Sequence, residues 1–430
     1  MRVMKDSGIE WIGAIPQNWE LRRIKTNFDI IAGATPKSGE ASFWDGDIPW
    51  ITPADYTTEG VYVSAGHKSI TQDGLNSCAT NLIPEGSIIF SKRAPVGLVA
   101  INSNSLCTNQ GCLSCIPKSA VDAKYYYYIM SIYGEQFDLF ASGTTFKEIS
   151  ADAFANFKLP YPDYETQKQI TSFLDARCAE IDALISAKEK TNALLKEQRQ
   201  SIIYEAVTKG LDPTVSMKDS GVKWIGGIPE GWEIAALKRL GTPATGSTPS
   251  KDNADYWDGD IPWVSSKDMK SDYLLDSEDH ITQTAVDECG LTLFAPGTLI
   301  FCVRSGILRH TFPVTVATLP VTINQDLRAL SLIGDVNPAF LLYYMRGMND
   351  TIVTLYQKIG ATVESIEMNW FLYFPVVLPS REEQDRIVEA LDSRCASLDQ
   401  TVKQNEATIR QLKEYRQSLI YEAVTGKIEV

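Results

Sequence analysis

Long apolar runs, signal sequences and dense cysteines are all missing from this chain of 430 residues. No stretch approaches the roughly 18–20 consecutive apolar residues that a membrane-spanning helix needs. The first residues mix charged and apolar side chains and have no signal-peptide core. Eight cysteines are too few for a disulfide scaffold in a chain of this length. We therefore expect a soluble, cytoplasmic protein with free thiols.

Metal ligands are also sparse. Cys112 and Cys115, with Cys107 nearby, could form half of a zinc site. Tetrahedral zinc needs four converging ligands, but no second cysteine pair follows at matching spacing and the three histidines are scattered. We expect core cysteines and no metal, with zinc as the minor alternative.

Catalytic motifs are equally absent. The sequence has no G-x-x-x-x-G-K-[ST] phosphate loop, and no G-x-G-x-x-G follows a predicted strand. Asn337-Pro338-Ala339-Phe340 lacks the second proline of the adenine-methylating N-P-P-[FY] motif. The histidines are too isolated for a nucleophile–base pair. The sequence thus predicts a non-catalytic protein with no cofactor of its own.

Positive charge is in deficit, with 40 Lys and Arg against 54 Asp and Glu, a net charge of −14. No segment of the chain is basic as a whole. Because DNA affinity depends on neutralising phosphates, any DNA binding must use local basic loops or partners that supply phosphate contacts.

What the sequence does contain is an internal duplication. Residues 4–20 return at 217–233 with 12 of 17 identities, and residues 165–208 return at 382–425 with 23 of 44. The stretches between these blocks diverge. A repeated frame with different inserts indicates two related modules that do the same task on two targets.

Each module begins with a mixed, strand-rich domain. Short apolar runs between Pro and Gly, such as 86–91 and 297–303, predict strands. The repeated W-D-G-D-I-P-W (44–50 and 257–263) predicts a turn with its tryptophans as core anchors, or alternatively an aromatic platform for a base. The tyrosines at 125–128 predict a helix face packed on a sheet, with some rings exposed. A stack for a flipped base is the alternative.

Each module ends in a long helix with apolar residues spaced alternately by four and three. About four to five heptads in each predict a coiled coil, with the other helix, running antiparallel, as the obvious partner. Lys188, Asn192 and Asn405 interrupt this seam, either to set the register or as solvated residues at its edge. The seam residues are Leu174, Ile181, Ile185, Leu195 and Ile202 in the first helix, and Leu391, Leu398, Val402, Leu412 and Leu419 in the second.

The predicted fold class is therefore α+β, with two strand-rich domains separated by two long helices in an antiparallel coiled coil and related by a pseudo-two-fold duplication. The predicted segments are a first domain at 1–164, a helix at 165–209, a second domain at 210–379, and a helix with a tail at 380–430.

These motifs resemble the specificity subunits of type I restriction-modification systems. The resemblance covers nearly the whole chain and rests on motifs that occur twice in the same order. They are the opening from Trp11 to Trp19, the G-x-T-P turn at 33–36, the W-D-G-D-I-P-W segment, a strand that ends in Arg93 or Arg304, and the Leu-Pro helix starts at 159 and 378.

The resemblance implies that each domain recognises one half of a split DNA target, while the helices set the spacer and dock methyltransferase subunits. It implies two methyltransferase and two restriction subunits as partners, with S-adenosylmethionine, ATP and Mg²⁺ bound by those partners. A coiled-coil scaffold that binds proteins, favoured by the net charge, is the alternative.

Candidate DNA contacts combine cations, amides and hydroxyls, because these groups read bases and position phosphates. Several occupy equivalent places in both modules, although each has a plain reading as a solvated or turn-capping residue. Arg93 and Arg304 are the strongest candidates. The candidates are Lys37, Lys68, Lys92, Arg93, Asn109, Gln110, Thr145 and Lys147 in the first module, and Lys251, Lys267, Arg304, Arg309, Gln325 and Thr362 in the second.

Overall fold

The computed structural model describes every residue except 1, 57–59, 143–146 and 359–362. By its internal contacts the chain divides into two units. Unit 1 comprises residues 1–188 and 406–430, and unit 2 comprises residues 189–405. Each unit contains part of both long helices, α6 (Tyr164–Lys209) and α11 (Arg381–Val424). The four-segment division drawn from the sequence stays a prediction.

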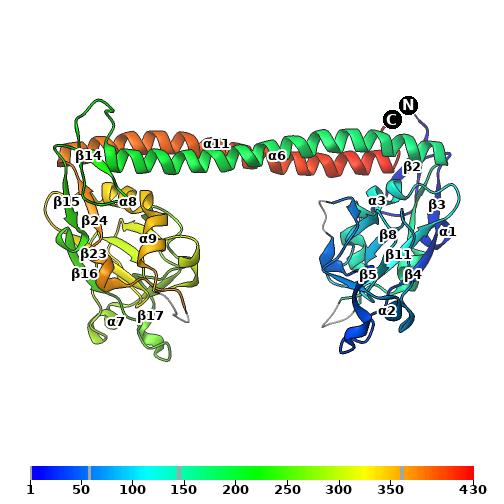
Figure 1. The fold of residues 1–430 in the computed structure, drawn as a ribbon, viewed down its shortest axis with the longest axis horizontal. Helices are drawn as coiled ribbons and strands as arrows, with labels where there is room; N and C mark the ends of the chain where they lie inside the picture. Colours follow the sequence, from blue (N-terminus) through cyan, green and yellow to red (C-terminus); the bar gives the residue numbers. More distant parts are fainter. Residues whose placement is uncertain (1, 57–59, 143–146, 359–362) are drawn as a thin grey trace. The chain divides into compact units, whose positions relative to one another are not determined.

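Unit 1 is built on a five-stranded sheet in the order β4-β11-β8-β9-β6 and a three-stranded sheet in the order β10-β5-β7 (Figure 1). Two further strand pairs, β1–β2 and β12–β3, complete it. The strands are β1 Met4–Asp6, β2 Ala14–Pro16, β3 Glu20–Arg23, β4 Phe28–Ala32, β5 Trp44–Ile51, β6 Tyr62–Val63, β7 Lys68–Ile70, β8 Ile88–Ser91, β9 Val99–Asn102, β10 Cys107–Thr108, β11 Cys112–Pro117 and β12 Lys158–Tyr161. The shorter helices are α1 Ile24–Asn27, α2 Gln72–Asn76, α3 Ala123–Ile132, α4 Gly134–Leu139 and α5 Ala151–Asn156, with 3-10 turns at Ala41–Phe43 and Pro53–Asp55.

The central strand β8 explains why an unbroken apolar run forms a strand here. Successive side chains of a strand point to opposite faces, and both faces of this sheet are covered. Ile88 and Phe90 enter the main core together with α3, whereas Ile89 enters a smaller core on the other face. Cys112 and Cys115 divide between the same two cores, so they cannot converge on one metal ion.

The tyrosine run of α3 packs as a helix face, but the prediction that some of its rings are exposed is wrong. Tyr125, Tyr126, Tyr127 and Tyr128 are all at most 3% exposed. Buried tyrosine hydroxyls need partners. Tyr125 donates to the carbonyl of Val424 on α11 at 2.9 Å, and Tyr128 donates to Asp175 on α6 at 2.7 Å. The run therefore fixes the sheet to the helices.

Unit 2 repeats this topology, including the segments whose sequences diverge. Its sheets have the orders β16-β23-β20-β21-β18 and β19-β17-β22, with pairs β13–β14 and β15–β24. Its strands are β13 Met217–Asp219, β14 Gly227–Pro229, β15 Glu233–Ala236, β16 Gly241–Thr245, β17 Trp257–Val264, β18 Tyr273–Leu274, β19 Asp279–Ile281, β20 Leu299–Cys302, β21 Val314–Ala317, β22 Thr322–Ile323, β23 Leu327–Leu332 and β24 Pro375–Leu378. Its helices are α7 Gln283–Glu288, α8 Pro338–Gly347, α9 Asn349–Tyr356 and α10 Met368–Phe371, with 3-10 turns at Leu237–Arg239, Ala254–Tyr256 and Gly306–Arg309.

The W-D-G-D-I-P-W motif is a strand with a bulge, which corrects the predicted turn. It forms β5 and β17, and the pairing of each shifts register inside the motif. Asp45 and Asp258 adopt φ of 59° and 58°, so the Asp-Gly signal for positive φ produces a bulge. Trp50 and Trp263 are buried as expected, whereas Trp44 and Trp257, also predicted as core anchors, are only partly buried.

A buried glutamine near the start of each long helix binds the strand-rich domain that precedes the helix in the chain. The Gln167 side chain accepts from the Asp122 backbone at 2.9 Å and donates to the Pro162 carbonyl at 2.9 Å. Gln384 makes the equivalent bonds to Asn337 and Pro379. Because a buried amide without partners is costly, these glutamines fix each helix start against its domain.

Within each unit the segments of α6 and α11 pack together, and an equivalent ion pair joins them. In unit 1 Arg416 lies 2.9 Å from Asp182, and in unit 2 Arg199 lies 3.1 Å from Asp399. The predicted seam residues Leu174, Ile181, Ile185, Leu391 and Leu419 are buried, whereas Leu195, Ile202, Leu398, Val402 and Leu412 are partly exposed.

The two asparagines of the seam decide between the readings that the sequence left open. Asn192 and Asn405 are 7% and 6% exposed, and they bond to each other within unit 2. In this unit residue 199 of α6 meets residue 399 of α11, and residue 192 meets residue 405, so the helices run antiparallel. The asparagines are buried partners and not solvated edge residues.

Candidate nucleic-acid interface

The G-x-T-P turn of each unit is fixed against an Asn-Gln turn. In unit 1 the Thr35 hydroxyl donates to the side-chain oxygen of Gln110, and in unit 2 Thr248 bonds Gln325 in the same way. The indole of Trp50 donates to the Ala34 carbonyl at 3.0 Å, with Trp263 and Ser247 as the equivalent pair. The repeat therefore preserves a complete polar cluster at equivalent positions.

Glycine is required at the start of this turn. A Cβ on Gly33 would collide with the backbone carbonyls of Asn109 and Thr108, and one on Gly246 would collide with Ile323. These close approaches of two main chains set the position of the exposed glutamine.

The Asn-Gln turns carry one structural and one presented amide each. Asn109 uses its side-chain oxygen to accept from the Gly111 backbone at 2.9 Å, and Asn324 does the same for Asp326. Gln110 and Gln325 are exposed. The asparagine therefore caps each turn, while the glutamine is exposed with its oxygen held by the threonine of the G-x-T-P turn.

A basic strand end lies beside this cluster in unit 1. Lys92 and Arg93 follow β8, and both bind Glu148, at 2.8 Å and 2.7 Å. The hydrogen bond from Lys92 is the largest effect on the pKa of Glu148 and lowers it; burial opposes this, and the hydrogen bond from Arg93 lowers the pKa further, so that the net shift is downward. Arg93 and Asn109 both line an open pocket of about 470 Å³.

Unit 2 places its cations differently at the same strand end. Arg304 is exposed, and Arg309 pairs with Glu364. Arg328, which the sequence reading missed because it lies within the apolar strand β23, donates to the Gln325 carbonyl at 3.2 Å. Desolvation lowers the pKa of Arg328.

The remaining predicted contacts vary in their surroundings. Lys37 and Lys251 are exposed beside the G-x-T-P turns, and the Lys68 ammonium lies 5.2 Å from the ring centre of Trp44. Lys147 binds Asp138 at 2.7 Å, and Lys267 binds Glu278 and Asp279. Thr145 and Thr362 lie outside the described residues.

Thr35 and Thr248 were not predicted as site residues, although the repeated G-x-T-P turn was the signal that could have found them. Amide, hydroxyl and guanidinium groups of this kind recognise base edges and phosphates. Among the described residues no three His, Cys, Asp or Glu side chains are grouped to hold a metal ion. Within the same part of the chain, none of the helices combines the length and apolar character needed to cross a membrane.

Two copies of one fold, each with a polar turn cluster beside a basic strand end, define a tandem recognition protein. The family model described as the type I restriction modification DNA specificity domain matches residues 16–195 and 229–413. The chain belongs to this family.

Related proteins support the assignment along the whole chain. The MjaIX specificity subunit of Methanocaldococcus jannaschii is 27% identical over 97% of this chain and 95% of its own length. The EcoR124I/EcoR124II specificity subunit of Escherichia coli is 28% identical over 63% and 62%.

The fold also matches solved structures. A chain from a study of complex assembly and conformational transition in the type I restriction-modification system aligns with a TM-score of 0.76 at 16% identity, over 96% of this chain and 99% of that one. The HsdS subunit of Thermoanaerobacter tengcongensis aligns with a TM-score of 0.54 at 16% identity, over 96% and 98%.

Proposed function

We propose that this chain is the DNA-recognition subunit of a type I restriction-modification complex, in which each unit reads one half of a bipartite target. The family assignment supports the class of function. The proposal for two different half-sites depends on how the two units differ at equivalent positions.

The observation that carries it is a shared fold with opposite charges at equivalent positions. In the strand pairing of unit 1, Lys68 of β7 lies opposite Trp50 of β5. In unit 2 the residue opposite Trp263 is Asp279 of β19. Arg93 forms a β-bridge with Glu148, and Arg304 forms the equivalent β-bridge with Ser365. The residues just before these partners, Lys147 and Glu364, therefore occupy equivalent positions. Because lysine suits guanine or phosphate and carboxylates accept from cytosine, the two units suit different sequences.

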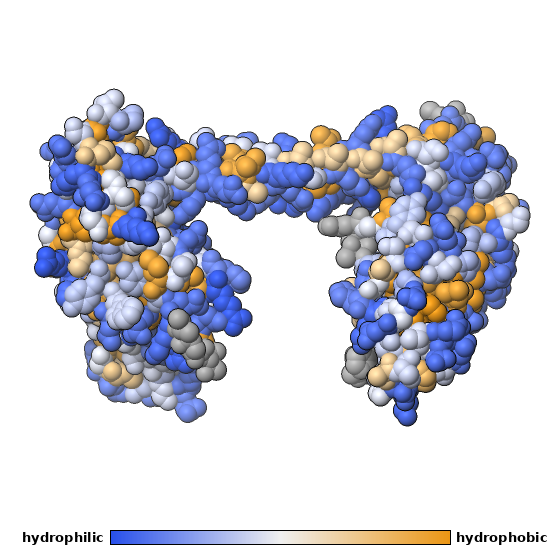
Figure 2. All heavy atoms as spheres, viewed as in Figure 1, coloured by the Kyte–Doolittle hydropathy of each residue, from blue (hydrophilic) through white to orange (hydrophobic). Residues whose placement is uncertain are grey.

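The chain itself supplies recognition, and catalysis belongs to its partners. We infer that two methyltransferase subunits dock along α6 and α11, which also set the unread spacer. Exposed leucines on the helices, such as Leu184 and Leu194, offer apolar surface for this contact, and Figure 2 shows apolar patches on the otherwise hydrophilic helix surface. Two restriction subunits complete the cytoplasmic complex.

The bound cofactors belong to the same partners. S-adenosylmethionine is expected on the methyltransferase subunits, and ATP and Mg²⁺ on the restriction subunits. The net charge of −14 supports dependence on partners, because this chain alone neutralises few phosphates.

The test is to express the chain with its methyltransferase subunit and map methylated adenines across a genome by single-molecule sequencing. A split motif with a fixed gap is expected, and the methyltransferase alone provides the control. If the chain adds no methylation pattern, a protein-binding scaffold explains it better.

Exchange of residues 1–164 for the corresponding domain of another specificity subunit tests the independence of the two units. One half of the methylated motif should change while the other half and the gap stay the same. A change in both halves would refute separate reading.

A further inference from the structure

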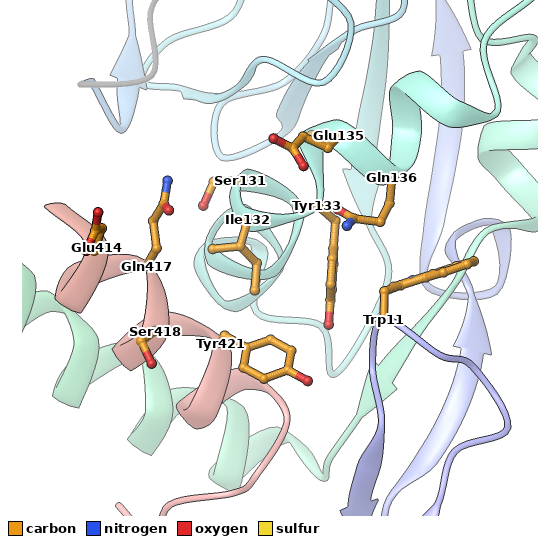
Figure 3. Close-up of a pocket in the computed structure, with 11 residues that line it drawn as sticks. Trp11, Ser131, Ile132, Tyr133, Glu135, Gln136, Glu414, Gln417, Ser418 and Tyr421 are labelled. Carbon is orange, nitrogen blue, oxygen red and sulfur yellow. The ribbon is translucent and has the colours of Figure 1, made fainter.

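Unit 1 contains an open pocket of about 510 Å³ between the α3–α4 corner and the C-terminal part of α11 (Figure 3). The pocket is lined by Trp11, Tyr133, Gln136 and Tyr421, together with polar residues of α3, α4 and α11. It shares no lining residue with the pocket beside Arg93. Its chemistry is therefore separate from the proposed DNA contacts.

Three polar atoms around this pocket are buried and have no hydrogen-bond partner among the described residues. They are Trp11 Nε1, Tyr133 Oη and Gln136 Oε1. The Tyr133 side chain is only 2% exposed, and its hydroxyl points toward the space between Trp11 and Tyr421 (Figure 3). A buried polar group without a partner is costly, so the Tyr133 hydroxyl and the Gln136 oxygen point to a ligand that donates to them, whereas the Trp11 N–H can only donate.

The equivalent place in unit 2 is arranged differently, because the Gln200 side chain bonds the end of α8, and two substitutions accompany this difference. Gly347 stands where unit 1 has Ile132, and it lets α8 approach α6 so closely that a Cβ there would lie 3.2 Å from Val207. The Gln200 side chain then donates to the carbonyls of Arg346 and Gly347, at 2.9 Å and 3.1 Å.

In unit 1 the same helix position is Gln417, which lines the open pocket. Met348 of unit 2 replaces Tyr133 at the residue that precedes the second helix of the corner, so the unpaired hydroxyl is also specific to unit 1.

The lining favours a cationic, donor-rich ligand. Glu135 and Glu414 contribute carboxylates and Gln136 contributes an amide oxygen, and no Lys, Arg or His occurs among the described lining residues. Lys427 lies nearby but bonds to the Tyr421 hydroxyl, which in turn donates to the Ile12 carbonyl at 3.0 Å. The Tyr421 hydroxyl is therefore already engaged.

A guanidinium group has five donors in one plane and stacks on aromatic rings, whereas an ammonium has three donors at one point. The Tyr133 hydroxyl and the Gln136 amide face the side of the pocket where the Trp11 ring lies, while Glu414 stands at the opposite side (Figure 3), and acceptors beside aromatic rings suit the planar group better. We propose that this pocket of unit 1 binds a guanidinium group.

The test is isothermal titration calorimetry of the full chain with agmatine. Binding should weaken about tenfold or more in E414Q, which removes a negative charge from the lining, and in Y133F, which removes an unpaired acceptor. E197Q is the matched control, since Glu197 holds the same helix position in unit 2, where Gln200 bonds the end of α8 and Met348 replaces Tyr133. 1,5-Diaminopentane should bind at least about tenfold more weakly than agmatine. Equal binding by all variants, or none at millimolar agmatine, would overturn the proposal.

A double variant separates the pocket from general stability. I132G with Y133M recreates the unit 2 corner, and it should abolish agmatine binding while thermal unfolding of the chain stays cooperative. Titration with acetyl-Gly-Arg-Gly-amide distinguishes the source: tighter binding than agmatine indicates an arginine of a partner protein, and weaker binding indicates a free guanidino compound. A crystal grown with agmatine that shows ordered water only in the pocket would contradict the assignment.

Discussion

The side-chain amide of Asn405 donates to the side-chain oxygen of Asn192 at 2.8 Å, and this bond lies inside the apolar seam of the two long helices. Polar pairs in such seams fix register at some cost in stability. The N405A variant should lower the free energy of unfolding by about 1–3 kcal/mol, because Asn192 loses this partner in a buried place. Replacing both residues by leucine should be nearly neutral or stabilising. Urea denaturation of the three proteins checks this, and equal losses in the single and double variants would contradict it.

The ion pairs of Glu148 predict a pH effect on stability. Lys92 and Arg93 hold the pKa of Glu148 below its unfolded value, so their contribution is complete above about pH 5 and is lost as the pH falls through the folded pKa. E148Q should be less stable than the parent at pH 7, by at most about 1 kcal/mol because the groups are partly exposed. The two proteins should converge as the pH falls through the folded pKa of Glu148. Urea midpoints measured from pH 3 to pH 7 test this, and a constant difference across that range would exclude the assigned cause.

Arg304 is an exposed cation at the strand end of unit 2. In the complex with methyltransferase, R304A should weaken binding to the cognate DNA and reduce the slope of log affinity against log salt by about 1 if it contacts phosphate. Fluorescence anisotropy across a salt series measures both quantities. K118A is the control, because Lys118 lies outside both long helices and pairs with Asp29. Equal effects of the two variants would remove Arg304 from the interface.

In the polar cluster of the G-x-T-P turn of unit 1, the main chain at Gly33 lies very close to the main chain of Thr108 and Asn109. G33A should destabilise unit 1 by about 1–3 kcal/mol, as overpacking does, and should impair one half-site more than the other. G39A is a matched control, since a Cβ on Gly39 meets nothing within 4 Å. Differential scanning calorimetry and methylation mapping give the two readouts. Equal behaviour of the two variants would show that the turn can shift freely.

The spacer role of the helices predicts the outcome of an insertion. Seven residues added to both α6 and α11 preserve the heptad phase and lengthen each helix by about 10.5 Å, or roughly three base pairs at 3.4 Å each. The gap in the methylated motif should widen by that amount with both halves intact. The same insertion in α6 alone should disrupt helix pairing. A changed half-sequence in the doubly extended protein would refute the ruler model.

The sequence predicted the repeated frame well, because heptad spacing and short apolar runs are local signals. It misread W-D-G-D-I-P-W as a turn, since the positive φ of Asp45 is compatible with a turn and with a bulge. Local pattern could not show that Thr35 meets Gln110, or that Glu148 binds Arg93, because these partners are 75 and 55 residues apart. The effect of Gly347 in place of Ile132 likewise depends on how closely a short helix approaches a long one, which local sequence pattern does not show.

The division of the chain has a consequence for its synthesis. Residues 189–405 of unit 2 are contiguous, but the main core of unit 1 includes Leu419, Ile420, Ala423 and Val424. The module translated first must therefore wait for the later one to leave the ribosome before its own interior is complete. A nonsense mutation shortly after codon 405 would leave the residues of unit 2 complete and would remove part of the core of unit 1.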